Sequence, residues 1–167
     1  MVRVAIFIAA STALALLSRR SLPAPRCHGF YRFFAFELLL TLVLLNAPNW
    51  FRDPFSTSQL ASWALLIVST GLAIVAFRLF FKVGKPAHGA SDETNLWFEN
   101  TTTLIATGVY RRIRHPMYAS LMGLGWGAFL KHPGWLGFGL ALGASGFLVA
   151  TSVTEERENV VRFGVPY

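Results

Sequence analysis

The chain of 167 residues lacks the residues that build covalent or metal-held scaffolds. It contains one cysteine, Cys27, and four histidines. A single cysteine excludes a disulfide within the chain and any Cys-x-x-Cys metal site. No histidine and cysteine have the spacing of a zinc site, and no internal repeat or low-complexity tract is present. We therefore expect one domain that holds no metal.

Apolar residues dominate the composition instead. They make up 54% of the chain, whereas about 45–50% is usual for soluble domains. The net charge of +7 would also suit a protein that binds nucleic acid. The basic residues flank apolar runs rather than cover a polar face, however, and that pattern is typical of membrane proteins. We therefore expect an integral membrane protein without a nucleic-acid partner.

Five apolar runs predict an all-α fold, because backbone in lipid must satisfy its own hydrogen bonds. A spanning helix needs about 20 mostly apolar residues. The third and fifth runs meet this length, the second meets it if it begins near Phe30, and the first and fourth are short. We predict a single membrane-embedded domain over residues 1–167, a bundle of about five transmembrane helices at residues 4–17, 30–47, 60–81, 117–130 and 135–153.

The first run has a second interpretation, a cleaved signal peptide. Arg3 ahead of a short apolar stretch is a weak form of that pattern. Ser18, Arg19 and Arg20 follow the run at once and are a poor context for cleavage. The five-helix prediction keeps the run, and the signal-peptide interpretation stays open.

Lysine and arginine divide unequally between the two ends of the predicted helices. If the N-terminus lies outside, only Arg3, Arg52 and Lys131 of the 15 basic residues are outside. The positive-inside rule then puts the C-terminus in the cytoplasm. We expect Lys131 and His132, in the outer turn, to have no functional role. The residues on the inner side are Arg19, Arg20, Arg26, Arg32, Arg78, Lys82, Lys85, Arg111, Arg112, Arg114, Arg157 and Arg162.

Two polar clusters interrupt the apolar pattern, TGVYRRIRHPMYASL at residues 107–121 and EERENVVRFG at residues 155–164. A short turn at residues 131–134 joins the two helices between them. Small residues four apart allow close approach of helices in lipid, so two glycine pairs predict a tight antiparallel hairpin. Such a hairpin brings Arg114 and His115 near Glu155 and Glu156. The alternative is that glycine is simply common in membrane helices. The pairs are Gly123 with Gly127 and Gly139 with Gly143.

The segment FENTTTLIATGVYRRIRHPMY, two predicted helices and EERENVVRFGVPY resemble the isoprenylcysteine carboxyl methyltransferase family. That family belongs to a wider group of integral membrane methyltransferases that includes phospholipid N-methyltransferases. The resemblance covers residues 98–167, where T-G-V-Y, R-H-P-x-Y, E-E and F-G-x-x-Y occur in order. The N-terminal helices carry no matching motif.

The resemblance implies an S-adenosylmethionine site on the cytoplasmic side and a lipophilic methyl acceptor that arrives from the bilayer. Arg114 and His115 would take the cofactor carboxylate, since charge-assisted hydrogen bonds are strong. The glutamates would take its ammonium or ribose hydroxyls, and the tyrosines would cover the adenine or face the sulfonium. No glycine-rich nucleotide loop is present, so a Rossmann methyltransferase is not supported. The implied cofactor-binding residues are Tyr110, Arg114, His115, Tyr118, Glu155 and Glu156, with Glu156 also catalytic.

Two departures from the family pattern concern the acceptor and the chain end. Prenylcysteine-type members would have an arginine five positions before Glu156 to hold the acceptor carboxylate, and here Thr151 stands there. Threonine supplies no positive charge. We expect prenylcysteine to be a poor acceptor and an uncharged or amine-bearing lipophile to be better. A phospholipid amine, a prenylated cysteine and a small hydrophobic thiol all remain open. The sequence stops at Tyr167, which would leave the cofactor site less closed.

Glu37 is an ionisable residue about two turns into the second predicted helix. A charge at this depth is unfavourable, so Glu37 should face the bundle interior and have a partner. One interpretation is a catalytic role, such as accepting the proton of an amine acceptor, and the other is a purely structural hydrogen bond. Arg111 and Arg112 are predicted to be boundary anchors, and Glu158 a solvated residue.

Two other functions stay open. A non-enzymatic membrane protein could retain this fold and bind a lipid or a partner. A reductase-like relative is the other, because some membrane sterol reductases resemble the hairpin, although 167 residues is short for one.

Overall fold

The structure is a computed structural model that describes residues 1–83, 105 and 107–164, without the side chains of residues 162 and 163. Across these residues the fold is all-helical, as the apolar runs predict. The predicted effect of the chain end at Tyr167 on the cofactor site concerns a residue outside the described part of the chain. The helices are α1 (Val2–Leu17), α2 (His28–Asn46), α3 (Thr57–Val83), α4 (Pro116–Phe129) and α5 (Trp135–Phe163), with 3-10 turns η1 (Ala47–Asn49) and η2 (Gly108–Arg111).

The predicted bounds of the first four helices agree with the structure to within three residues. The last helix was expected to end at residue 153, and instead α5 continues ten residues further, to Phe163. Glutamate and arginine are good helix formers once a helix is established, so the helix goes on where the apolar run stops. The second polar cluster is therefore helical.

Three helices are long and apolar enough to cross a membrane: residues His28–Asn49, Thr57–Val83 and Trp135–Val161. At 1.5 Å per residue, the 14 residues of α4 span about 21 Å, less than the hydrocarbon core of about 30 Å. The apolar helix α1 is also shorter, with 16 residues. These long apolar helices indicate a membrane protein. In the described part of the chain three helices, rather than the predicted five, have the length needed to span a membrane.

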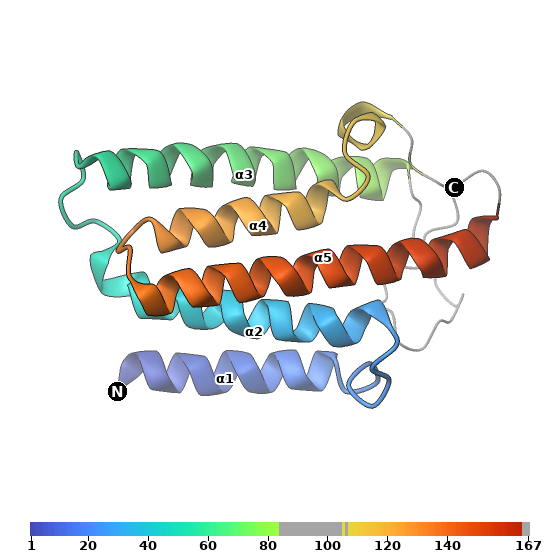
Figure 1. The fold of residues 1–167 in the computed structure, drawn as a ribbon, viewed down its shortest axis with the longest axis horizontal. Coiled ribbons are helices and arrows are strands. Elements are labelled where there is room, and N and C mark those ends of the chain that lie inside the picture. The colour runs from blue at the N-terminus through green and yellow to red at the C-terminus, as the bar shows by residue number, and fades with distance from the viewer. Residues whose placement is uncertain (84–104, 106, 165–167) are drawn as a thin grey trace.

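The five helices lie along one common axis, and consecutive helices run in opposite directions (Figure 1). Helix α2 packs chiefly on α5, α3 chiefly on α4, and α1 against α2 at the edge. The bundle thus has two ends. The arginine end holds the α1–α2 loop, the end of α3, η2, the start of α4 and the last part of α5. The lysine end holds the α2–α3 connection and the α4–α5 turn, which contains Lys131.

The paired glycines of α4, Gly123 and Gly127, face α3 and not α5. A Cβ atom on Gly123 would lie 2.1 Å from Ser69 Oγ, and one on Gly127 would lie 2.8 Å from the Leu66 side chain. The nearest atom to a Cβ on Gly143 belongs to Leu38 of α2, and nothing described lies within 4 Å of one on Gly139. Helices α4 and α5 do pack as antiparallel neighbours. The predicted role of the glycine pairs in joining them is nevertheless wrong, because Gly123 and Gly127 lie at the α3–α4 contact and Gly143 lies at the α2–α5 contact.

Lys131 is buried and has a structural role, which the sequence did not predict. Its side chain is 3% exposed, and its Nζ donates a hydrogen bond to Gln59 Oε1 (3.0 Å). The ammonium also lies 3.5 Å from the centroid of the Trp63 ring, a cation–π geometry. Burial lowers the pKa of Lys131. Lys131 therefore links the α4–α5 turn to the start of α3, whereas His132 is exposed as expected.

Amide and hydroxyl side chains complete the lysine end. Gln59 Nε2 donates to the carbonyl oxygens of Asn49 (2.9 Å) and Lys131 (3.2 Å), and Asn46 Nδ2 donates to Ala128 O (2.9 Å). Beside them, Leu42, Ala128 and Ala141 form a small buried core where α2, α4 and α5 meet. The polar side chains here bind backbone carbonyls near the ends of helices, so this end is closed by its own residues.

Candidate functional site

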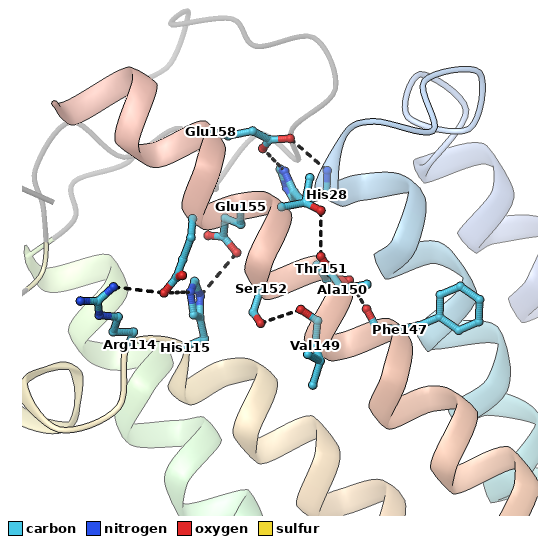
Figure 2. Close-up of polar contacts among 12 residues, drawn as sticks. His28, Arg114, His115, Phe147, Val149, Ala150, Thr151, Ser152, Glu155 and Glu158 are labelled. Carbon is cyan, nitrogen blue, oxygen red and sulfur yellow. Dashed lines mark hydrogen bonds and ion pairs between the residues drawn. The ribbon is translucent and has the colours of Figure 1, made fainter.

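The two polar clusters of the sequence meet at the arginine end. Pro116 begins α4, so His115 is its N-cap residue. His115 Nδ1 lies 3.7 Å from Glu155 Oε2, and His115 Nε2 lies 3.5 Å from Glu156 Oε1. Arg114 Nη1 donates to Glu156 Oε1 at 3.3 Å. The predicted proximity of these four residues is confirmed (Figure 2).

The contacts within this cluster leave hydrogen-bonding capacity unused. The side chain of His115 is 16% exposed, whereas that of Arg114 is 70% exposed. Within the part of the chain that the structure describes, the buried atoms His115 Nε2 and Glu155 Oε2 have no hydrogen-bond partner. Buried polar atoms are almost always hydrogen-bonded in folded proteins. Two such atoms on facing helices are therefore suited to bind a polar ligand.

Two tyrosines flank the cluster. The Tyr118 ring stacks on the His115 ring, with centroids 5.7 Å apart and 22° between the planes. Tyr110, in η2, donates from its hydroxyl to Ala76 O of α3 (3.4 Å). Burial and, to a smaller extent, the negative charge of Glu155 raise the pKa of Tyr110 to about 12. Both predicted tyrosines are thus near the cluster, but the Tyr110 hydroxyl is bonded to α3.

Glu37 lies away from this cluster. Ser11 Oγ of α1 donates to Glu37 Oε1 (2.9 Å), and Thr41 Oγ1 donates to Glu37 O (2.8 Å). Glu37 comes nine residues after His28, which is about 13 Å along α2. Its contacts are those of the structural interpretation, and the structure does not bring it together with the other predicted site residues. A catalytic role for Glu37 stays a prediction.

Glu158 is bound to the start of α2, so the prediction of a solvated residue is wrong. His28 N donates to Glu158 Oε1 (3.0 Å), and His28 Nδ1 lies 2.5 Å from Glu158 Oε2. The His28 side chain is 3% exposed. Figure 2 shows this pair and the His115 contacts on either side of Glu155. Glu155 and Glu158 are three residues apart and share a helix face. A prediction that extended the last helix past residue 158 would have placed both glutamates on this face.

Arg32 and Thr151 lie on the packed faces of α2 and α5. Arg32 is buried, one helical turn after His28, and Thr151 is fully buried. The His28–Glu158 pair and the Phe34–Phe147 ring contact (5.4 Å) bracket them along the antiparallel interface. Thr151 Oγ1 donates to Phe147 O of its own helix (2.7 Å). Sequence reasoning counted Arg32 as a boundary charge, whereas the structure buries this permanent positive charge between helices.

In the described residues no group of three or more His, Cys, Asp and Glu side chains is arranged to hold a metal ion. Comparisons of the chain with protein-family models, with curated proteins and with solved structures find no match.

Proposed function

We propose that the protein is an integral membrane methyltransferase that uses S-adenosylmethionine and acts on a lipophilic acceptor. The observation that carries the proposal is the meeting of His115, Glu155 and Glu156, where two buried polar atoms have no hydrogen-bond partner among the described residues. The order of the short sequence motifs is the basis of the family resemblance, and the contacts of His115 with Glu155 and Glu156 are consistent with it. The motifs come from two polar clusters that are distant in sequence and adjacent in space.

The charges of the cluster suit this cofactor. Arg114 carries one positive charge and the two glutamates carry two negative charges, so these three side chains together are net negative. S-adenosylmethionine has a sulfonium, an ammonium and a carboxylate, and is therefore net positive. A ligand with both signs of charge can pair with Arg114 and with a glutamate at the same time. Arg114, Glu155 and Glu156 therefore fit the charges of S-adenosylmethionine.

Each residue has a distinct task in this proposal. Arg114 and His115 would bind the cofactor carboxylate, and Glu155 or Glu156 would bind the ammonium or the ribose hydroxyls. Tyr118, held against His115, would cover the adenine or face the positive sulfur. The bound cofactor supplies an electrophilic methyl group. The chain orients the acceptor toward it and keeps water away, which is most of what a methyl transfer requires.

The level of the cluster along the bundle suits an acceptor that arrives from lipid. Glu155 comes twenty residues after Trp135, about 30 Å along α5 and thus about one hydrocarbon thickness from its start. We propose that all five helices contribute to the membrane bundle, with the N-terminus outside and the cluster at the cytoplasmic surface. The unequal distribution of lysine and arginine supports this orientation.

For the acceptor we propose an uncharged or amine-bearing lipophile. The Thr151 hydroxyl binds the backbone of its own helix and offers no positive charge to an acceptor carboxylate. Purified protein given radiolabelled methyl donor should methylate phosphatidylethanolamine better than farnesylcysteine. Efficient methylation of farnesylcysteine would show that an arginine at position 151 is dispensable, and the acceptor proposed from Thr151 would be wrong.

Cofactor binding is the decisive test of the proposed function. Calorimetry in detergent should detect binding of S-adenosylhomocysteine, the demethylated product. His115→Ala and Glu156→Ala should each weaken it by about 1.5–3 kcal/mol, the usual contribution of hydrogen bonds to charged groups. Arg112→Ala is the matched control, because Arg112 is an exposed neighbour. If the folded wild type does not bind S-adenosylhomocysteine, the non-enzymatic hypothesis replaces the methyltransferase proposal. If the wild type binds and both alanine variants bind as tightly as it does, the assignment of His115 and Glu156 to the site is wrong.

A further inference from the structure

The α1–α2 loop, residues 18–27, is a folded segment. Ser21 N donates to Ser18 O (2.9 Å), Ala24 N donates to Ser21 O (3.0 Å), and Cys27 N donates to Ala24 O (3.1 Å). The two serines are 6% and 2% exposed. Successive turns fix the path of the backbone. The loop therefore has a defined shape before any ligand binds, which lowers the entropy lost on binding.

Three arginines project from this loop. Arg19, Arg20 and Arg26 are all exposed. Among the described residues, no carboxylate forms an ion pair with any of the three. The guanidinium group binds phosphate in a bidentate manner and stays charged at every physiological pH. The loop is thus a preformed group of three cations available to an anion.

The three glutamates described at the arginine end have partners other than the loop arginines. Glu158 binds His28, and the other two glutamates of α5 contact His115 and Arg114. These three glutamates lie on α5 in the middle of the bundle, and the α1–α2 loop lies toward its edge (Figure 1). Within the described residues, this segregation leaves the positive charge of the loop without a compensating carboxylate.

The position of the loop favours a lipid over a dissolved anion. It follows directly on the last turn of α1, where Leu16 and Leu17 are exposed, and it precedes α2, a helix of spanning length. An apolar surface that ends in arginines marks the boundary between hydrocarbon and headgroups. At this level the most concentrated anions are the phosphates of acidic phospholipids.

We propose that the α1–α2 loop is a binding site for the headgroups of anionic phospholipids, with Arg19, Arg20 and Arg26 as the phosphate-binding residues. Charge-assisted hydrogen bonds from three guanidinium groups distinguish an anionic headgroup from a zwitterionic one, whose own ammonium competes for the phosphate. This inference needs only a membrane protein and is independent of methyl transfer.

Native mass spectrometry of the full chain, released from detergent with equal amounts of phosphatidylglycerol and phosphatidylcholine, tests the proposal. Wild type should retain phosphatidylglycerol preferentially. Each basic residue near a membrane surface contributes about fivefold in affinity, so the triple variant Arg19→Gln/Arg20→Gln/Arg26→Gln should lose roughly a hundredfold. The triple lysine variant should keep much of the preference. Arg3→Gln/Arg52→Gln is the matched control, because both residues are exposed at the lysine end.

Equal retention of the two lipids by wild type would overturn the proposal, as would an equal loss in the control variant. A further arm adds heparin and a short oligonucleotide as soluble polyanions. Displacement of the lipid by either one at equal charge concentration would assign the loop to a dissolved partner and reject the lipid site. Thermal unfolding of each variant in the same detergent establishes that the substitutions leave the bundle folded.

Discussion

The two ends of the bundle use polar side chains in opposite ways. At the lysine end, Lys131 donates to Gln59, and Gln59 and Asn46 donate to backbone carbonyls, all at 2.9–3.2 Å. At the arginine end, His115 lies 3.5–3.7 Å from two glutamates, and its Nε2 and Glu155 Oε2 have no hydrogen-bond partner in the described part of the chain. One end is satisfied by its own residues, and the other is not.

This difference separates a structural polar cluster from a candidate ligand site. A buried donor that already binds a carbonyl gains little by binding anything else, and losing it leaves an unsatisfied group behind. A buried donor that lies 3.5–3.7 Å from its acceptor, as His115 does, can still gain a shorter hydrogen bond by binding a ligand. Substitutions should therefore change stability at the lysine end and ligand affinity at the arginine end.

Lys131→Ala should give the largest loss of stability. It removes the ammonium from Trp63 and leaves Gln59 Oε1 without its donor. We expect the free energy of unfolding in detergent to fall by about 2–4 kcal/mol, with no change in affinity for S-adenosylhomocysteine. His132→Ala is the control, because His132 is an exposed neighbour. Equal effects of the two substitutions would contradict the structural role of Lys131.

Glu158→Gln tests whether the arginine end also contains a structural contact. The substitution keeps the shape of the side chain and removes the charge that pairs with His28. Since Glu158 is partly exposed, we expect a smaller loss, about 1–2 kcal/mol in the unfolding free energy. Arg157→Gln, an exposed neighbour, should have almost no effect. If both variants unfold alike, the His28–Glu158 contact contributes nothing measurable.

Alkaline pH should act on the arginine end through Tyr110. Its pKa is raised from 10.0 to about 12, so between these values the unfolded phenol ionises while the folded one stays protonated. The stabilising contribution of Tyr110 is therefore complete below pH 10 and is lost as the pH rises toward 12. Melting curves should show wild type losing stability over this window more steeply than Tyr110→Phe.

Absorbance of the tyrosinate gives a second check on the same group. Glu155→Gln removes the smaller cause of the raised pKa, so Tyr110 should titrate at a somewhat lower pH in that variant. An unchanged titration would mean that burial alone sets the pKa.

Glu156→Gln should give the smallest change in stability. Its partner Arg114 is 70% exposed, and exposed ion pairs contribute about 1 kcal/mol or less. The same variant should nonetheless weaken S-adenosylhomocysteine binding clearly. A large loss of stability without a change in binding would mean that the two ends of the bundle do not differ as described.

The sequence was a good guide wherever a local property decides the structure. Apolar runs located all five helices, and the short turn before Trp135 was enough to bring His115 near Glu155. The end of α5 was mispredicted, because hydropathy marks the membrane-facing part of a helix, while helix propensity carries the backbone on through residues 154–163.

Contacts that depend on the register between distant helices were not predictable from local pattern. His28 meets Glu158 because α2 and α5 pack antiparallel over their whole contact, and Arg32 is buried for the same reason. Nothing near Lys131 in the sequence reveals Gln59 or Trp63. The glycines of α4 likewise indicate that another helix packs closely, but they do not indicate which helix it is. Pairing between helices is a property of the whole chain.

The burial of Lys131 has a practical consequence for mapping the orientation of the protein in vesicles. Trypsin cleaves after a lysine only when the side chain can enter its specificity pocket, and amine-directed labels need an accessible, unprotonated amine. With 3% of its surface exposed, Lys131 will resist both reagents on whichever side of the bilayer its turn lies. Uncut peptide at residues 131–132 therefore says nothing about sidedness. Arg52, which is exposed in the neighbouring connection, is the residue whose cleavage reports it.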